Sequence, residues 1–556
     1  MRSKEKVTGT FIPLMDDETD RTMPLLTTYL SRIRRVALSS PSSPASNLPM
    51  AQSSSPSSHS RGGGDTGRQG SVTLVMGNPS ADLDSIISAI VLSYFYNNNN
   101  NTTKDTRRRR MYVPILNLPF VRSKELWRLR PEFGVALRLA MGEKPENVRR
   151  GGDGKRQSGD GQGKTAKMLE EILTIADVLD DQGSVLHKVF AAAVTSADEK
   201  QEVILVDHNA PSIPIPGLSD EVIRSRLEIT GCIDHHVDEG YVSGDADPRM
   251  IRTGIGSCTS LVVQHLRDKG LWQPTTSAPS QEDNDHHLRD DADDDDGPRQ
   301  MARLALAPIL IDTSNLKAKG DKCSDLDREV VKFLESIVKH SNDGDGDVKG
   351  QGTTTTSEKT ESGAKWDRDA IHEILSKSKT NSLDLLTMQE IFDRDYKSWA
   401  EHTKTAAAGV AAKNTETVNI GISSLVKPLS WLVRHAGGVK EFLDEVDRFA
   451  HDETRTLGIF AMLTRAGDGR KELVLLAMDH KIKGVVDNTF EARAGGELEL
   501  KAWDEDGDLI QALDQRVVTG EQRQQQLASW EIWWMGDTSK SRKQVGPLVR
   551  EVTRES

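Results

Sequence analysis

The 556-residue chain has few aromatic side chains, no long apolar run and no excess of positive charge. Phe, Trp and Tyr make up 5% of the residues, against 36% hydrophobic and 28% charged, which is enough for two domains and much unfolded sequence. Because no stretch of about 18 apolar residues occurs, we expect no segment to span a membrane. The net charge of -13 argues against a protein that coats nucleic acid but leaves room for a local basic site.

Cysteine is also scarce. Cys232, Cys258 and Cys323 stand far apart, which argues against a disulfide framework and a zinc ribbon and indicates a reducing compartment. We therefore expect a soluble, cytoplasmic protein. The Arg- and Ser-containing segment from Tyr29 has some character of a mitochondrial leader, but the stretch MDDETD from Met15 is too acidic for one, so mitochondrial targeting stays an alternative.

Low-complexity sequence divides the chain into expected domains. Residues 38–70 are rich in Ser, Pro and Gly and contain too little apolar surface to fold. Four other segments of low complexity begin at Asn97, Arg149, Asp283 and Ser341, the first three expected as loop insertions and the fourth as a linker. This division predicts a disordered extension at 1–70, a first domain at 71–340, a linker at 341–365 and a second domain at 366–552.

Short apolar runs alternate with helical patterns between those segments. Five runs have the aliphatic character of strands buried on both faces of a parallel sheet, at 71–76, 111–118, 202–207, 228–234 and 306–312. Helices are expected at 84–96, 164–179, 257–269 and 324–340. The sequence therefore predicts an α/β fold, with an open parallel sheet followed by a smaller C-terminal α/β domain.

Acidic residues stand at the ends of the predicted strands. Asp82 and Asp84 follow the first strand, and Asp207, Asp234 and Asp312 close three others. In an open parallel sheet these positions share the edge where ligands bind. So many carboxylates would repel one another, so we expect a cation among them, and two divalent metals would meet this need. The imidazoles of D-H-N at 207–209 and D-H-H at 234–236 favour Mn²⁺ or Mg²⁺ over a structural zinc, which prefers thiolates.

Each of these features also has a purely structural explanation. Asp84 could cap the following helix, the other aspartates could cap helices of their own, and His235 with His236 could form a surface turn. A second D-H-H begins at Asp285 in an acidic segment with no strand before it, so the tripeptide alone carries no weight. The ordered set of four strand-end motifs is what points to a metal site.

The series G-N-x-x-x-D-x-D-S, D-H-N, D-H-H and strand-D-T resembles the DHH phosphoesterase superfamily, in the branch of fungal exopolyphosphatases, prune-type proteins and family II pyrophosphatases. The resemblance covers about 72–340 and, more thinly, 385–550. It implies two metals, with Asp82 on the first, Asp84, His235 and Asp312 on the second, and Asp207 on both. His236 would face the substrate phosphate, while Asp234 and His208 would orient ligands. Asn78 is a further candidate ligand, because it stands where the pyrophosphatases have histidine, and asparagine points to the exopolyphosphatase side.

The second domain carries basic motifs. The sequence SRKQ at Ser541 is similar to a phosphate-gripping motif of the pyrophosphatases, and RDYKSW resembles the start of the same domain. The expected phosphate contacts are Lys397, Arg542 and Lys543, with Lys317 and Arg130 as lesser candidates. A solvated basic turn is the alternative for SRKQ. The sequence GIGSCTS from Gly254 predicts a helix N-terminus that either holds an anion or serves helix packing.

Together these features imply a metal-dependent exopolyphosphatase, with its active site in the cleft between the domains. A metal-activated water would release the terminal phosphate, with Asp207, His236, Arg542 and Lys543 as the catalytic set. A pyrophosphatase, a nucleotide phosphodiesterase and a prune-like interaction protein with incidental catalysis remain the alternatives. Inorganic polyphosphate is the expected partner, and no nucleic-acid or membrane partner is expected.

Overall fold

The computed structural model describes most of the two expected domains. The described residues are 11–13, 23–38, 69–102, 110–150, 159–184, 186–191, 200–215, 218–273, 297–339, 366–403, 417–517 and 527–555. The second D-H-H motif, which begins at Asp285, lies outside them.

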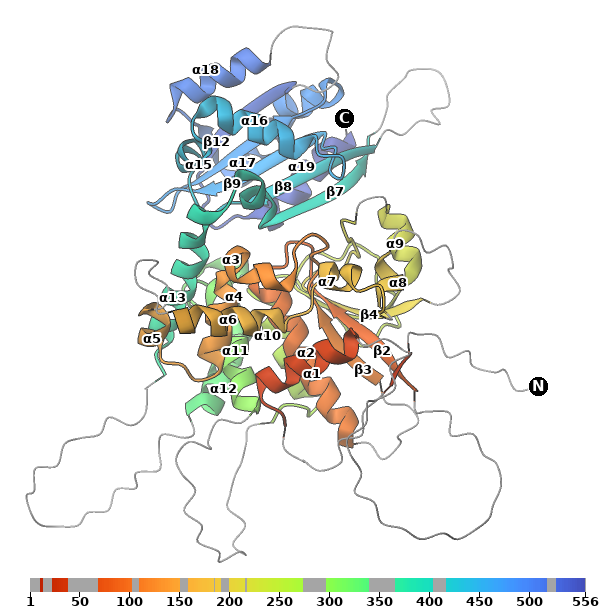
Figure 1. The fold of residues 1–556 in the computed structure, drawn as a ribbon. Coiled ribbons are helices and arrows are strands. Elements are labelled where there is room, and N and C mark those ends of the chain that lie inside the picture. The colour runs from red at the N-terminus through yellow and green to blue at the C-terminus, as the bar shows by residue number, and fades with distance from the viewer. Residues whose placement is uncertain are drawn as a thin grey trace, which may run out of the picture.

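The first domain is built on a sheet of five parallel strands in the order β3-β2-β4-β5-β6 (Figure 1). Their bounds are Gln69–Met76 for β2, Arg110–Ile115 for β3, Gln201–Val206 for β4, Leu227–Asp234 for β5 and Arg249–Ile251 for β6. A short strand β1, Phe11–Pro13, pairs antiparallel with the start of β2. Strand β4 is buried along its whole length, as expected for an aliphatic strand covered on both faces. The predicted α/β class is confirmed.

The fifth predicted strand is wrong. Residues 306–312 form the end of helix α11, Gly297–Asp312, which contains Pro308. This helix is buried over nearly all of its length, so its sequence lacks the polar face that would have revealed a helical period. The fifth parallel strand is β6, whose three residues carry no strong strand signal. Asp312 therefore closes a helix.

The other helices of the first domain mostly follow the predictions. They are α1 Leu26–Ala37, α2 Leu83–Thr102, α3 Leu126–Leu129, α4 Pro131–Ala140, α5 Pro145–Arg150, α6 Gly159–Glu170, α7 Ile175–Asp180, α8 His187–Phe190, α9 Asp220–Arg226, α10 Cys258–Asp268 and α12 Asp325–Lys339. Helix α2 continues through part of the Asn-rich stretch that was expected to be a loop. The helix predicted at 164–179 is two helices, α6 and α7, because a break at 171–174 separates them.

The N-terminal region is not wholly unfolded, contrary to the prediction for 1–70. Helix α1 buries Leu26, Tyr29 and Ile33 in the core of the first domain. The backbone N–H of Leu26 donates a hydrogen bond of 2.8 Å to the side chain of Gln300 in α11. Arg34 forms an ion pair of 2.9 Å with Asp177. The apolar face of α1 is therefore part of the first domain.

The second domain has a mixed six-stranded sheet in the order β11-β12-β10-β9-β8-β7, in which β8 and β9 are parallel and the other pairs antiparallel. The strands are β7 Tyr396–His402, β8 Thr417–Ser424, β9 Ile459–Arg465, β10 Lys471–Ala477, β11 Leu500–Ala502 and β12 Ser529–Met535. The helices are α13 Arg368–Asn381, α14 Met388–Asp393, α15 Leu429–Ala436, α16 Val439–Ala450, α17 Phe490–Leu498, α18 Gly507–Arg516 and α19 Arg542–Glu555. None of the described helices has the length and apolar character needed to cross a membrane.

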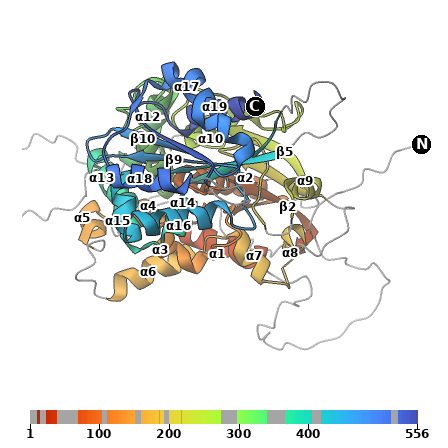
Figure 2. The ribbon, with the colours of Figure 1, turned by 90° about the horizontal axis from the view of Figure 1, so that it is seen from above.

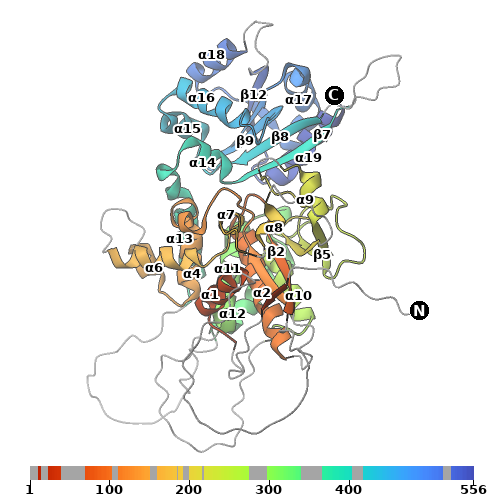
Figure 3. The same ribbon diagram turned by 45° about the vertical axis from the view of Figure 1, so that its right-hand side comes forward.

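The two domains are stacked, and the second sheet overlies the first domain in the view from above (Figure 2). Strand β7 and helix α19 lie on the side of the second domain that faces the first (Figure 3). A buried ion pair of 2.6 Å joins Arg394, which follows α14, to Glu132 of α4. A second pair of 2.7 Å joins Arg128 of α3 to Glu390 of α14. Charged side chains therefore hold the two domains together across their interface.

Candidate metal and phosphate site

Asp207 lies at the centre of the site, directly after β4. It is 2% exposed, and its φ of 61° lies in the left-handed region that aspartate tolerates better than most residues. Its Oδ1 atom is 3.0 Å from Nε2 of His235 and 3.9 Å from Nδ1 of His236. Within the described part of the chain, these three residues form the group whose metal-ligating atoms lie within 4.8 Å of one another. An Asp/His₂ set of this kind can hold a divalent metal.

Two other predicted ligands, Asp82 and Asp312, lie in the same acidic neighbourhood. Burial and the charge of Asp84 raise the pKa of Asp207 to about 7. Burial and the charge of Asp207 raise the pKa of Asp82, and burial with the charges of Asp84 and Asp82 raises the pKa of Asp312 well above its ordinary value. The structure thus brings the predicted carboxylates together, and their mutual repulsion would be relieved by a cation among them.

Asp82 and Asp84 have different local roles. Asp82 precedes α2, and its Oδ1 accepts a 3.0 Å hydrogen bond from the backbone N–H of Ser85, so Asp82 is the N-cap of this helix. Asp84 points to the start of α10, where it accepts hydrogen bonds from the N–H groups of Cys258 at 2.6 Å and Thr259 at 2.9 Å. The GIGSCTS helix start therefore binds an anion, but that anion is the chain's own carboxylate. Asp84 is positioned here by α10, although it was expected to face a metal.

Asn78, the further candidate metal ligand, contacts Asp207 directly. Its Nδ2 group donates a 2.6 Å hydrogen bond to Oδ2 of Asp207, while its Oδ1 accepts from Ser80 and from the backbone N–H of Ala81. An amide ligates a metal through its oxygen, and here that oxygen already accepts two hydrogen bonds. Ser85 donates a second bond to the same oxygen of Asp207, at 2.7 Å. Asn78 and Ser85 therefore orient the Asp207 carboxylate, and the serine that ends the G-N-x-x-x-D-x-D-S pattern was the available signal for the second contact.

Asp234 holds the second histidine of the D-H-H motif. Its Oδ1 accepts a 2.7 Å hydrogen bond from Nδ1 of His236, and its Oδ2 accepts one of 2.6 Å from Asn209. Burial alone would raise the pKa of Asp234, but His236, His235 and Asn209 together lower it, so this carboxyl stays ionised. Burial and the charge of Lys397 lower the pKa of His236 well below its ordinary value. His236 is thus neutral, with its proton on Nδ1 and its Nε2 open as an acceptor.

His208 does not take the orienting role expected for it. Its Nδ1 donates to the backbone carbonyl of Val206 at 3.1 Å, and its buried Nε2 has no partner among the described residues. The third residue of D-H-N takes that role, because Asn209 fixes Asp234.

Basic side chains from the second domain reach the cluster. The Nζ atom of Lys543 at the start of α19 is 2.9 Å from Nε2 of His235. Burial and this positive charge lower the pKa of His235 to about 4, so its ring is neutral. Lys397 of β7 is half-buried near Asp207, whose charge partly offsets the lowering of the lysine pKa by burial and by Arg542. Lys543 and Lys397 therefore face the carboxylates, as the sequence predicts.

Arg542 has a different partner. Its guanidinium donates to the backbone carbonyl of Asp395 and forms a 3.0 Å ion pair with the Oδ1 atom of the same residue. The two side chains are 14% and 21% exposed, so the pair is largely buried. Burial alone would raise the pKa of Asp395, but Arg542 and nearby lysines lower it.

Lys317 and Arg130, the lesser candidates for phosphate contacts, both have partners within the protein. The Lys317 side chain is 74% exposed and pairs with Asp369 at 3.6 Å, so its contact with phosphate stays a prediction. Arg130 is buried and donates a 2.7 Å hydrogen bond to the backbone carbonyl of Arg394. Its guanidinium helps to fix the domain interface.

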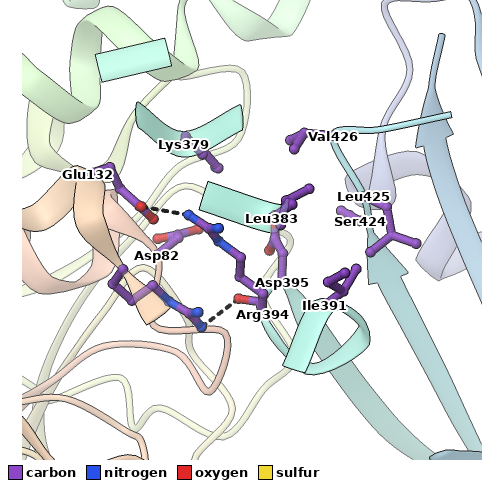
Figure 4. Close-up of a pocket in the computed structure, with 11 residues that line it drawn as sticks. Asp82, Glu132, Lys379, Leu383, Ile391, Arg394, Asp395, Ser424, Leu425 and Val426 are labelled. Carbon is purple, nitrogen blue, oxygen red and sulfur yellow. Dashed lines mark hydrogen bonds and ion pairs between the residues drawn. The ribbon is translucent and has the colours of Figure 1, made fainter. Parts of the chain in front are cut away.

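A pocket beside Asp82 is lined by a lysine that the sequence analysis did not identify. Lys379 of α13 lines this pocket together with Asp82, Arg394 and Asp395 (Figure 4). Its charge offsets part of the rise in the pKa of Asp82 and helps to lower the pKa of Asp395. No motif surrounds Lys379, so only the fold could place it near the carboxylates.

Two protein-family models match this chain, one in each of its two domains. The model of the DHH family, N-terminal domain, matches residues 72–288, and that of the DHHA2 domain matches residues 373–552. A Schizosaccharomyces pombe protein named "Putative exopolyphosphatase" is 25% identical over 494 residues, which are 87% of this chain and 92% of that protein. The crystal structure of an exopolyphosphatase-related protein from Bacteroides fragilis is 12% identical, has a TM-score of 0.31 and is matched over 80% of this chain and 90% of that one.

Proposed function

Given that the chain belongs to the DHH/DHHA2 phosphoesterases, we propose that it is an exopolyphosphatase that releases terminal orthophosphate from inorganic polyphosphate. The observation that carries this proposal is the approach of Lys543 from the second domain to His235, at 2.9 Å. This contact brings the ammonium group of Lys543 to the acidic residues of the first domain. A substrate with several phosphates needs both, because metals would engage the reacting phosphate while lysines neutralise its charge.

The residues present fit divalent metals. Asp207 and His235 offer ligand atoms 3.0 Å apart, and Asp82 and Asp312 add oxygen donors whose repulsion calls for a cation. We propose two ions, Mn²⁺ or Mg²⁺, because oxygen and imidazole donors without thiolates suit these metals. When bound, such metals supply a Lewis acid that polarises the phosphoryl group and activates water.

The chain's own groups account for the rest of the chemistry. Asn78 and Ser85 fix the orientation of Asp207, and Asp234 fixes the ring of His236. The open Nε2 of neutral His236 can accept a hydrogen bond from the attacking water or from a protonated phosphate oxygen. Lys397 and Lys543 stabilise the negative charge that grows on the phosphoryl oxygens, and their partial burial strengthens that attraction. The guanidinium of Arg542 is paired with Asp395, and we propose that its remaining N–H groups contact a substrate phosphate.

Substrate comparison with purified protein tests this proposal. Long-chain polyphosphate, tripolyphosphate, pyrophosphate, cyclic AMP and single-stranded DNA are incubated with Mn²⁺, with Mg²⁺ or with EDTA, and released orthophosphate or nucleotide is measured. We expect metal-dependent orthophosphate release that is fastest on polyphosphate. Faster release from pyrophosphate or cyclic AMP would replace the proposed activity by another of the same family, and no release from any of them would favour an interaction protein.

A variant of a second aspartate, Asp238, provides a matched control for the variant of Asp207. Asp207→Ala should abolish release at every metal concentration, because Asp207 is the carboxylate that contacts His235. Asp238→Ala should behave as wild type, since Asp238 lies after the same D-H-H motif but is 39% exposed and pairs with Arg249. Near-normal turnover in Asp207→Ala would refute the proposed metal centre.

A further inference from the structure

The two ring nitrogens of His235 have different partners. Nε2 lies 3.0 Å from Oδ1 of Asp207, whereas Nδ1 is 3.1 Å from the backbone carbonyl oxygen of Ile255. A carbonyl oxygen can only accept a hydrogen bond, so Nδ1 carries the proton of the neutral ring and the lone pair of Nε2 is left for a metal. The carbonyl of Ile255 therefore determines which nitrogen of His235 can bind a metal.

The peptide group that contains this carbonyl is held on its other side by Asp327 of α12. Its N–H group belongs to Gly256 and donates a 2.9 Å hydrogen bond to Oδ2 of Asp327. Because the C=O and N–H groups of a planar trans peptide point in opposite directions, the carboxylate fixes the direction of the carbonyl that accepts the His235 proton. A carboxylate acceptor also polarises the peptide, which strengthens its carbonyl as an acceptor.

Glycine is required where this carboxylate meets the backbone. A Cβ atom at Gly256 would lie 2.5 Å from the backbone oxygen of Lys322 and 3.0 Å from Oδ2 of Asp327, which is too close for the backbone oxygen to allow. Gly254 has a φ of 79°, in the left-handed region that favours glycine. The contact between Asp327 and the peptide therefore accounts for the glycines of GIGSCTS.

Asp327 is itself firmly held. Its side chain is 0% exposed at the third position of α12, where it exchanges hydrogen bonds with the N-cap residue Ser324. Its Oδ1 atom accepts a 2.6 Å hydrogen bond from the hydroxyl group of Ser260 in α10. Donors from two helices thus occupy both carboxylate oxygens and fix the side chain against Gly256.

We propose that Asp327 is a positioning residue of the candidate metal centre, which acts through the peptide between Ile255 and Gly256 to orient the ring of His235 for a metal. The inference rests on the proposed metal centre, and it concerns a residue that is not itself a ligand. Removing a partner that orients a metal-binding histidine lowers metal affinity by about ten- to a hundredfold.

Metal titration of three variants tests this role. In calorimetric titration with Mn²⁺, Asp327→Asn should bind the same number of ions with about tenfold lower affinity or less, because its amide has one acceptor oxygen where two are used. Asp325→Asn is the matched control, since it removes the same charge from the same turn of α12 at an exposed position, and its affinity should be unchanged. Ser324→Ala removes the N-cap but keeps the bond from Gly256, so it should lower Tm and leave Mn²⁺ affinity unchanged.

A measurement on the wild-type chain decides the case in which Asp327→Asn does not fold. The sequence contains two Ile–Gly pairs, at 255–256 and 420–421. Labelling isoleucine carbonyls with ¹³C and glycine nitrogens with ¹⁵N therefore gives two peptide signals in a carbonyl-selected NMR spectrum. Addition of Mg²⁺ should shift the Ile255–Gly256 signal, because this peptide accepts the proton of the metal-binding ring, and leave the signal of Gly421 in β8 in place.

The outcomes separate this role from the proposed function. Unchanged Mn²⁺ affinity in a folded Asp327→Asn, or an equal loss in Asp325→Asn, would overturn the role of Asp327. An Ile255–Gly256 signal that stays in place, under conditions in which Mg²⁺ supports polyphosphate hydrolysis, would do the same, and the proposed function would stand. If the wild type binds no Mn²⁺, the metal centre and the role of Asp327 fail together.

Discussion

Replacing Arg542 separates its ion pair with Asp395 from the phosphate contact that the sequence predicts for it. Its guanidinium makes two charge-assisted hydrogen bonds to Asp395, and both side chains are mostly buried. Such bonds contribute about 1.5–3 kcal/mol, and loss of one partner from a fully buried pair costs about 3–5 kcal/mol. Because both groups keep some solvent contact, we expect Arg542→Ala to lower the free energy of unfolding by about 2–3 kcal/mol. For a domain of this size that is about 4–12 °C in Tm.

The double variant Arg542→Ala/Asp395→Ala provides the decisive comparison. Removing Asp395 as well eliminates the unpaired carboxylate, whose charge would otherwise act on Asp82. Stability, measured by calorimetry, should therefore return most of the way to wild type. If Arg542 also contacts phosphate, kcat/KM on polyphosphate should stay about ten- to a hundredfold low in the double variant, because the fork remains absent.

Two results would refute this reasoning at different points. An unchanged Tm in Arg542→Ala would show that the ion pair contributes nothing to stability. Recovery of both Tm and kcat/KM in the double variant would show that Arg542 serves only to neutralise Asp395, and the phosphate contact predicted from SRKQ would then be wrong.

Three further predictions address the metal centre and the domain interface. Asn78→Ala should keep the wild-type Mn²⁺ stoichiometry in calorimetric titration but lose about tenfold in kcat/KM, because its amide orients Asp207; loss of one Mn²⁺ equivalent would make it a ligand instead. Asp285→Ala should retain wild-type hydrolysis of polyphosphate, and any large loss would bring the second D-H-H into a site. Burial alone would raise the pKa of Glu132, but Arg394 and Arg130 hold this pKa below its ordinary value. The ion pair therefore stabilises the protein at pH values above the unfolded-state pKa of Glu132, and this stabilisation is lost as the pH falls through the folded-state pKa. The Tm difference between wild type and Glu132→Gln should therefore be largest near neutral pH and shrink in acid, and a difference that does not change with pH would contradict this.

Local sequence was sufficient wherever a residue's position follows from a short pattern. Asp207 and Asp234 directly follow or close parallel strands, and the pairing of β4 with β5 brings their ends together. Residues 306–312 were misread because a short, fully apolar run has the same composition in a buried helix and in a buried strand. Asp312 still reaches the other carboxylates, since the end of α11 lies at the same edge of the domain.

Groups that act through tertiary contacts could not be predicted in this way. Lys379 and Arg394 come from parts of the chain in which the sequence showed no site motif, so only packing of the two domains brings them beside Asp82. The same applies to the amide of Asn78, whose direction depends on the hydrogen bonds of Ser80 and Ala81 to its oxygen. Sequence identifies which residues can bind a metal, whereas packing decides which of their atoms face it.

The position of α1 has a consequence for how the protein is made in the cell. Leu26 donates its backbone hydrogen bond to Gln300, a residue 274 positions later in the chain. At roughly 5–20 residues per second, a ribosome needs on the order of 15–50 s to synthesise that interval. During this time the apolar side chains of Leu26, Tyr29 and Ile33 have no complete partner surface, which makes the nascent amino terminus a natural substrate for chaperones that bind exposed apolar segments.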